Sequence, residues 1–122
     1  MPQNDQVPPL GEPSGEPVAE LADLDVAVQR LAGRLRSLAQ RRLRAGAADT
    51  GLELARWLDR RAQLLEFPDR TPFVMPDDGV SAVGDQLALA GRELLAVARR
   101  PEHRALLVEA RQKVAEAARV VD

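Results

Sequence analysis

Residues 21–38, LADLDVAVQRLAGRLRSL, place leucine or valine at alternating intervals of three and four residues. This spacing gathers the apolar side chains on one side of an α-helix, so it predicts an amphipathic helix that packs on its neighbours. Comparable stripes in three later segments predict an all-α fold. The stripe residues are, in chain order, Leu21, Leu24, Val28, Leu31, Leu35 and Leu38; Leu54, Leu58 and Leu65; Val83, Leu87, Ala90, Leu94 and Val97; and Leu107, Ala110, Val114, Ala117 and Val121.

The composition agrees with a helical core made of small side chains. The chain has 122 residues, of which 45% are hydrophobic and 30% charged, and these values fit one soluble globular domain. Only Trp57, Phe67 and Phe73 are aromatic, so we expect leucine, valine and alanine to fill the core. Leucine and alanine also favour helices intrinsically.

We expect an antiparallel up-and-down four-helix bundle. Residues 1–16 are acidic and rich in proline, which predicts a disordered tail, and residues 17–122 form a single helical domain. Because the link between the first two helices is short, we expect these helices to pack on each other as antiparallel neighbours. The helices are predicted at about 17–45, 50–66, 80–99 and 101–121.

Terminating and capping residues set these boundaries. Pro17 suits the first helical position, where its missing N–H is not needed, and Gly46 is a typical C-terminal stop. Thr50 and Glu53 have the spacing of a capping box. Pro101 leaves two alternatives: a break before a fourth helix, which we favour, or one long kinked helix that forms a dimerisation arm.

Residues 67–79, FPDRTPFVMPDDG, connect the second and third helices, and we call this segment the strap. Its three prolines prevent regular secondary structure, whereas Phe73, Val74 and Met75 are too apolar to be left in water. We therefore expect an extended segment whose apolar residues plug one end of the bundle.

The sequence lacks the residues that common catalytic and cofactor sites need. The absence of cysteine excludes disulfides, thiolate nucleophiles and cysteine-ligated metals. His103 is the only histidine, and its neighbours Glu102 and Arg104 fall on other helix faces, so we predict a solvated or capping role. Phosphate-binding loops, nucleophile elbows and EF-hand patterns are also missing. We expect no enzymatic activity, no cofactor and no bound metal.

Residues 31–42 resemble the first helix of the small all-helical chorismate mutases, in leucines at heptad spacing and in several arginines. The resemblance implies a lysine near that helix, which those enzymes use to bind a dicarboxylate. The only lysine of this chain is Lys113, near the opposite end, so the resemblance does not extend to the substrate site.

We expect a cytoplasmic protein without a membrane segment. Residues 1–16 lack the basic and then apolar pattern of a secretory signal, and the most apolar window, 80–98, is interrupted by charged residues. The large excess of arginine over lysine, together with abundant alanine, leucine and glycine, is typical of a GC-rich, actinobacterial-like genome.

We predict a non-enzymatic interaction or regulatory protein that binds a protein partner through an exposed helical surface. The alternative partner is a second copy of the chain, and because coiled-coil-like stripes often pair between chains we expect a homodimer as readily as a monomer. Glycines inside a helix cost about 1 kcal/mol each relative to alanine, which is tolerated where another backbone approaches closely. The expected contact region combines such a small-residue line with the strap: Gly84, Ala88, Gly91, Phe73 and Met75.

Two alternative functions stay open. Residues 30–61 hold nine arginines and three acids, a local net charge of +6 that suits nucleic-acid phosphates, although stacking aromatics and a helix-turn-helix are missing. The other alternative is a small-molecule-binding helical bundle, which a buried cluster of arginines and carboxylates would indicate. The basic surface comprises Arg34, Arg41, Arg42, Arg44, Arg60 and Arg61.

Overall fold

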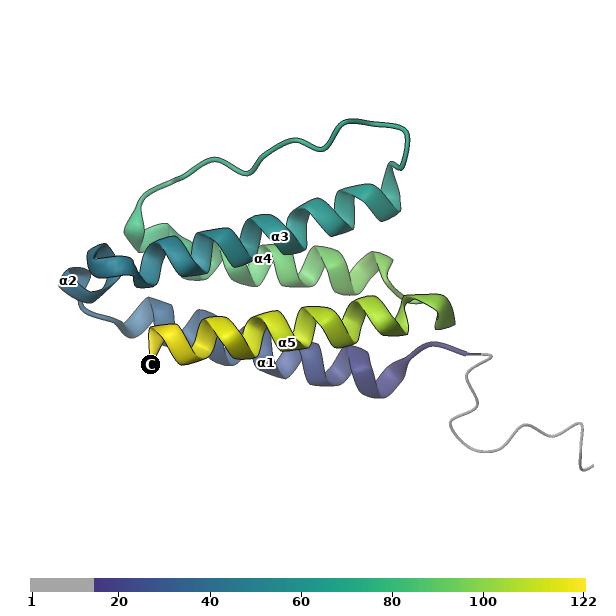
Figure 1. Cartoon of the computed structure of the whole chain (residues 1–122), viewed down its shortest axis with the longest axis horizontal. Coiled ribbons are helices and arrows are strands. Elements are labelled where there is room, and N and C mark those ends of the chain that lie inside the picture. Colours follow the sequence, from purple (N-terminus) through teal and green to yellow (C-terminus); the bar gives the residue numbers. More distant parts are fainter. Residues whose placement is uncertain (1–14) are drawn as a thin grey trace, which may run out of the picture.

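The computed structural model describes residues 15–122, and most of the expected N-terminal tail lies outside this range. Within it, four long helices form an all-α bundle, as predicted (Figure 1). Short helical turns precede three of them. The elements are α1 (Val18–Ser37), α2 (Gln40–Arg42), the π-helical turn η2 (Leu43–Ala47), α3 (Ala48–Glu66), the 3-10 turn η3 (Val80–Ala82), α4 (Val83–Val97), the 3-10 turn η4 (Pro101–His103) and α5 (Arg104–Val121).

The helices pack as a square in which α1 and α3 occupy diagonal corners. Helix α1 lies against α4 and α5, and α3 lies against the same two helices. The expectation that the first two helices pack on each other is therefore wrong. The connection between them contains α2 and η2 and is longer than predicted, so it can carry the chain across the end of the bundle to the far corner.

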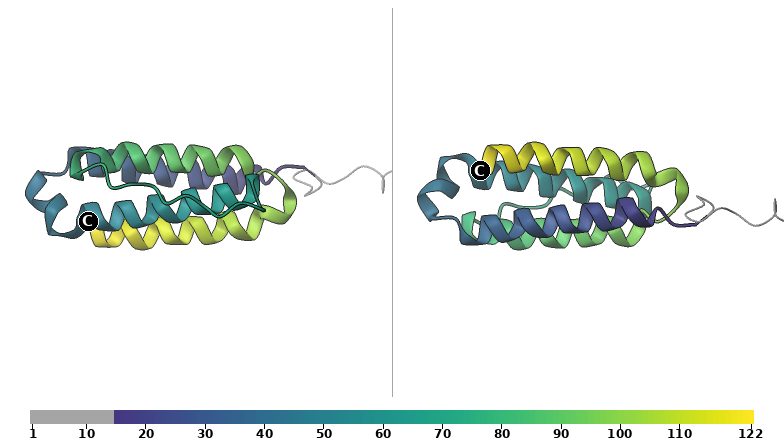
Figure 2. Two further views of the ribbon diagram at one scale, coloured as in Figure 1. Left: turned by 90° about the horizontal axis from the view of Figure 1, so that it is seen from above. Right: turned by 90° about the horizontal axis from the view of Figure 1, so that it is seen from below.

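The bundle consists of two layers of parallel helices, with the layers running in opposite directions. Gly51 and Val83, near the starts of α3 and α4, lie side by side, so these two helices point the same way. The ion pairs Arg104–Glu20 and Arg34–Asp122 show the same for α1 and α5. Figure 2 shows the α3–α4 layer from above and the α1–α5 layer from below.

The path of the strap explains why the direction does not alternate between α3 and α4. An extended segment of this length spans about 40 Å, whereas a 19-residue helix such as α3 is about 28 Å long. The strap therefore returns along the whole bundle before α4 begins, and α4 starts beside the start of α3 (Figure 1). The connections before α3 and α5 stay at one end of the bundle and give the expected reversals.

The predicted first helix, 17–45, is interrupted. Helix α1 ends at Ser37, and Leu38 and Ala39 are extended before the chain turns into α2. The break allows Leu43 and Ala47 to be buried over the end of the bundle, which a straight helix projecting beyond it would not permit.

Gly46 lies within η2, and it separates the helical turn that begins with α2 from α3, as expected. Its φ of 139° favours glycine. Helix α3 begins at Ala48, directly after η2, without a side-chain cap. Thr50 already lies inside the first turn, so the predicted capping box is wrong.

The break at Pro101 is confirmed. Arg100 is extended, and residues Pro101–His103 form a turn that leads into α5. The backbone N–H of Arg100 donates to Nδ1 of His103 at 3.2 Å, which is the predicted capping role of this histidine.

The core is built from leucine, valine and alanine, as predicted, and it joins all four helices. The predicted stripe residues are buried except Leu38, Leu65 and Val97, which are half-buried. The largest side chains without solvent contact include Leu24, Leu35, Leu58, Leu87, Leu94 and Leu107.

Two glycines of α4 bring this helix close to α1. A Cβ atom at Gly84 would lie 2.9 Å from the carbonyl oxygen of Ala32, and one at Gly91 would lie 2.7 Å from Cγ1 of Val28. Neither distance leaves room for a methyl group without movement, so the small-residue line serves the close packing of two helices within one chain.

We predict that Gly84→Ala lowers the free energy of unfolding by about 1–3 kcal/mol, because the new methyl group overlaps a backbone oxygen. The matched control is Gly33→Ala in α1, where nothing lies within 4 Å of the new Cβ. This control is expected to gain up to about 1 kcal/mol from helix propensity alone. Urea denaturation followed by circular dichroism measures both. Equal stabilisation of both variants would contradict the close helix contact.

Candidate functional site

The structure does not gather the five predicted contact residues on one surface. Gly84, Ala88 and Gly91 are buried in the bundle. Within the strap, the side chain of Met75 is buried, whereas that of Phe73 is 67% exposed. The first four residues are therefore already covered within the chain, and only Phe73 is presented to solvent.

The strap lies along the groove between α3 and α4 and does not plug an end of the bundle (Figure 2). Its backbone is held by side chains of both helices. Gln63 of α3 donates to the carbonyl oxygen of Phe73 at 2.7 Å and accepts from its N–H at 2.8 Å. Arg56 donates to Met75 and Gln86 of α4 donates to Pro76, both at 2.8 Å. The prediction of an end plug is wrong because these donors run along the helices.

The six arginines of the predicted basic surface are also divided. Arg41, Arg42 and Arg44 lie in α2 and η2 at one end of the bundle, whereas Arg60 and Arg61 lie in the second half of α3. Several of these guanidinium groups have partners within the chain. Arg42 donates to the carbonyl oxygen of Val121 at 2.9 Å, Arg34 pairs with Asp122 at 2.7 Å, and Arg61 pairs with Glu109 at 3.6 Å while lying over the ring of Trp57.

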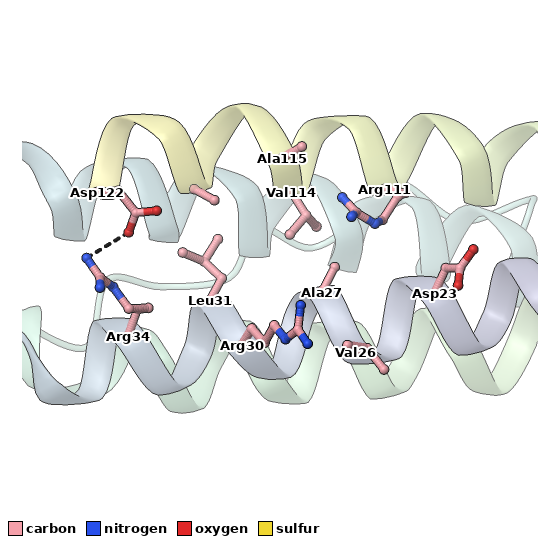
Figure 3. Close-up of a pocket in the computed structure, with 11 residues that line it drawn as sticks. Asp23, Val26, Ala27, Arg30, Leu31, Arg34, Arg111, Val114, Ala115 and Asp122 are labelled. Atoms are coloured by element: carbon pink, nitrogen blue, oxygen red, sulfur yellow. Dashed lines mark ion pairs between the residues drawn. The ribbon is translucent and has the colours of Figure 1, made fainter.

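A different set of residues forms an open groove of about 860 Å³ between α1 and α5, on the face opposite the strap (Figure 3). Its size falls within the range of ligand and peptide sites. We call it the α1–α5 groove. Its apolar surface comes from Val26, Ala27 and Leu31 of α1 and from Val114, Ala115 and Ala118 of α5.

Charged residues border this groove in an ordered way. Asp23 lies towards one end, and the Arg34–Asp122 ion pair closes the other. Between them, Arg30 from α1 and Arg111 from α5 direct their guanidinium groups towards each other across the apolar surface (Figure 3). Among residues 15–122, neither of these two arginines forms an ion pair.

Two converging guanidinium groups are suited to an anion. In water, two like charges even 4 Å apart repel by only about 1 kcal/mol, so the folded chain tolerates the pair. A carboxylate placed between them would accept charge-assisted hydrogen bonds from both, and these are about twice as strong as neutral ones. The groove therefore combines an anion-binding centre with an apolar floor.

Neither arginine of this pair belongs to the basic surface predicted from the sequence. Arg30 is among the nine arginines of residues 30–61, whereas Arg111 lies in the last predicted helix. Both arginines border an apolar stripe, next to Leu31 and three residues before Val114. That signal is visible in the sequence, but only the packing of α1 against α5 brings the two together.

A cluster of carboxylates lies between α3 and α4. Burial, followed by the neighbouring Asp59 and Glu66, raises the pKa of Glu93 above its ordinary value of 4.5. Gln63 donates to Asp59 at 2.8 Å. In the part of the chain that the structure describes, no group of three or more acidic or histidine side chains is arranged to hold a metal ion. Because the pKa of Glu93 is raised, the cluster is a source of pH dependence.

We predict that Glu93→Gln raises the free energy of unfolding at pH 7. A raised folded-state pKa means that the native chain holds its proton longer, so the native protein loses stability as the pH rises from about 4.5 through that pKa. The variant cannot lose this proton and should lack the decline. Thermal denaturation between pH 4 and pH 8 measures the difference, with the exposed Glu53→Gln as control. Identical pH profiles of the native chain and Glu93→Gln would contradict the shift.

We also predict that Arg30→Gln and Arg111→Gln change the free energy of unfolding by no more than about 0.5 kcal/mol, because neither residue stabilises the fold through an ion pair. The comparison is Arg42→Gln, which removes the hydrogen bond to Val121 and should cost about 1 kcal/mol. Urea denaturation distinguishes these outcomes. A larger loss for Arg30→Gln or Arg111→Gln would mean that these arginines are structural.

Comparison with known proteins adds no relative. No protein-family model matches the chain, and no curated protein or solved structure is significantly similar to it. No helix of residues 15–122 is both long and apolar enough to cross a membrane.

Proposed function

We propose that this chain is a non-enzymatic interaction protein that binds a protein partner through the α1–α5 groove. The observation that carries the proposal is the convergence of Arg30 and Arg111 over an apolar floor. Protein interfaces are enriched in arginine, and their strongest contacts combine such side chains with buried apolar surface. Both elements are present here on one accessible face.

The groove favours a different protein over a second copy of this chain. A symmetric dimer places the same patch on both partners, so Arg30 and Arg111 of one copy would meet the same arginines of the other. Like charges facing each other across an interface oppose association. The homodimer expected from the sequence is therefore not proposed at this face, and the expected cytoplasmic location stays a prediction.

The two alternative functions receive less support. A nucleic-acid interface would need the six arginines of the basic surface on one face, yet Arg34, Arg42 and Arg61 have partners within the chain. A small-molecule site inside the bundle would need buried charged groups, but Gln86 is the only buried polar residue among residues 15–122. We therefore retain one proposal and treat nucleic acid as an outcome of its test.

Site-specific photo-crosslinking in the source cells tests this proposal. A photoreactive amino acid replaces Val26, an exposed residue that lines the groove, or Val18, an even more exposed valine of the same helix outside it. We predict a defined protein adduct from position 26 that is absent from position 18. The adduct should disappear when Arg30→Glu and Arg111→Glu are combined.

Three outcomes would contradict the proposal. An adduct with a second copy of the chain would make the groove a dimer interface. An adduct with nucleic acid would favour the alternative function. Adducts that are the same from both positions, or that survive the double charge reversal, would show that the groove is not the binding site.

A further inference from the structure

The chain itself covers one layer of the bundle and leaves the other open. The strap lies along the α3–α4 groove, whereas no segment of residues 15–122 crosses the α1–α5 groove on the opposite face (Figure 2). Each groove is formed by two parallel helices. The filled groove therefore indicates what kind of segment this bundle accommodates.

The strap is held by a simple combination of contacts. It buries one apolar side chain, Met75, and it receives hydrogen bonds on its backbone carbonyl groups from Arg56, Gln63 and Gln86. These donors come from both flanking helices, so the extended backbone is clamped from two sides. Extended segments need such partners because their own backbone groups form no internal ladder.

The α1–α5 groove also combines an apolar surface with side-chain donors from both flanking helices, but here both donors are positively charged. Its apolar floor includes Leu31 and Val114, and its donors Arg30 and Arg111 come from the two flanking helices. In the strap groove, two of the three donors are neutral amides, whereas here both are guanidinium groups. Guanidinium groups prefer carboxylates, which accept two parallel hydrogen bonds.

The dimensions of the groove limit the length of its ligand. From Asp23 to Arg34 along α1 the lining spans about 17 Å, at 1.5 Å per helical residue. An extended peptide covers this distance with about five residues, at about 3.3 Å each. Asp23 and Asp122 border the two ends and would repel a ligand carboxylate there, so the acidic side chain is directed to the middle.

We infer that the α1–α5 groove binds an extended, acidic segment of its protein partner. A carboxylate of that segment lies between Arg30 and Arg111, and an adjacent apolar side chain packs on the partly exposed floor residues Ala27, Ala115 and Ala118. This inference rests on the proposed function and specifies the class of partner: a short acidic peptide motif that is bound in the manner of the strap.

Selection from a random library of 12-residue peptides, displayed on phage, tests the inference on the full chain. Peptides that also bind the combined Arg30→Glu and Arg111→Glu variant are removed first. The matched control combines Arg41→Glu and Arg119→Glu, which changes the net charge equally at exposed positions of the same chain outside the groove.

We expect the recovered peptides to share an aspartate or glutamate beside an apolar residue. Exchanging that acid for its amide should weaken binding to the native chain by about tenfold or more, the loss of a charged hydrogen bond. Binding should be unchanged in the control variant and should weaken with rising salt. Circular dichroism should show no gain of helix when the peptide binds.

Each contrary result has a distinct meaning. Groove-dependent peptides without an acidic residue, or peptides that become helical on binding, would overturn the inference while leaving the proposed function intact. Failure to recover any groove-dependent peptide would overturn the inference even if the Val26 crosslink captures a protein. If that crosslink fails as well, the proposed function falls with it.

Discussion

The close approach of α4 to its neighbours is the constraint on which the rest of the structure depends. Gly84 and Gly91 let α4 approach α1, and Gly51 of α3 lies against Val83. With scarcely any aromatic residues available, the core reaches high packing density by bringing backbones together rather than by filling space with large rings. Helix α4 thereby fixes the position of α1 on one side and of α3 on the other.

Helix α5 packs differently, and the groove is a consequence. Its contact with α1 is bordered by Arg30, Arg34 and Arg111, which line the open groove between the two helices. On the opposite layer, the strap and its hydrogen-bonding partners cover the corresponding groove. The same architecture therefore produces one closed face and one open face, and the open face carries cations.

Several arginines of this chain connect segments that are distant in sequence. Arg36 pairs with Asp85, Arg99 with Glu16 and Arg104 with Glu20. Exposed pairs of this kind contribute at most about 1 kcal/mol each, so they favour one register more than they add stability. Arg30 and Arg111 differ from these pairs because they converge from two helices on one open groove, and this arrangement carries the proposed function.

The sequence by itself determined the helices and their buried faces, because a period of 3.6 residues reports which side of each helix must be covered. It also determined the break at Pro101 and the stop at Gly46, which are local backbone effects. The sequence could not determine which apolar stripe packs on which other stripe. The diagonal placement of α1 and α3 and the direction of α4 follow from the route of the strap and from glycine contacts between distant segments. The α1–α5 groove depends on that pairing, since Arg30 and Arg111 are 81 positions apart in the chain and meet only across two packed helices.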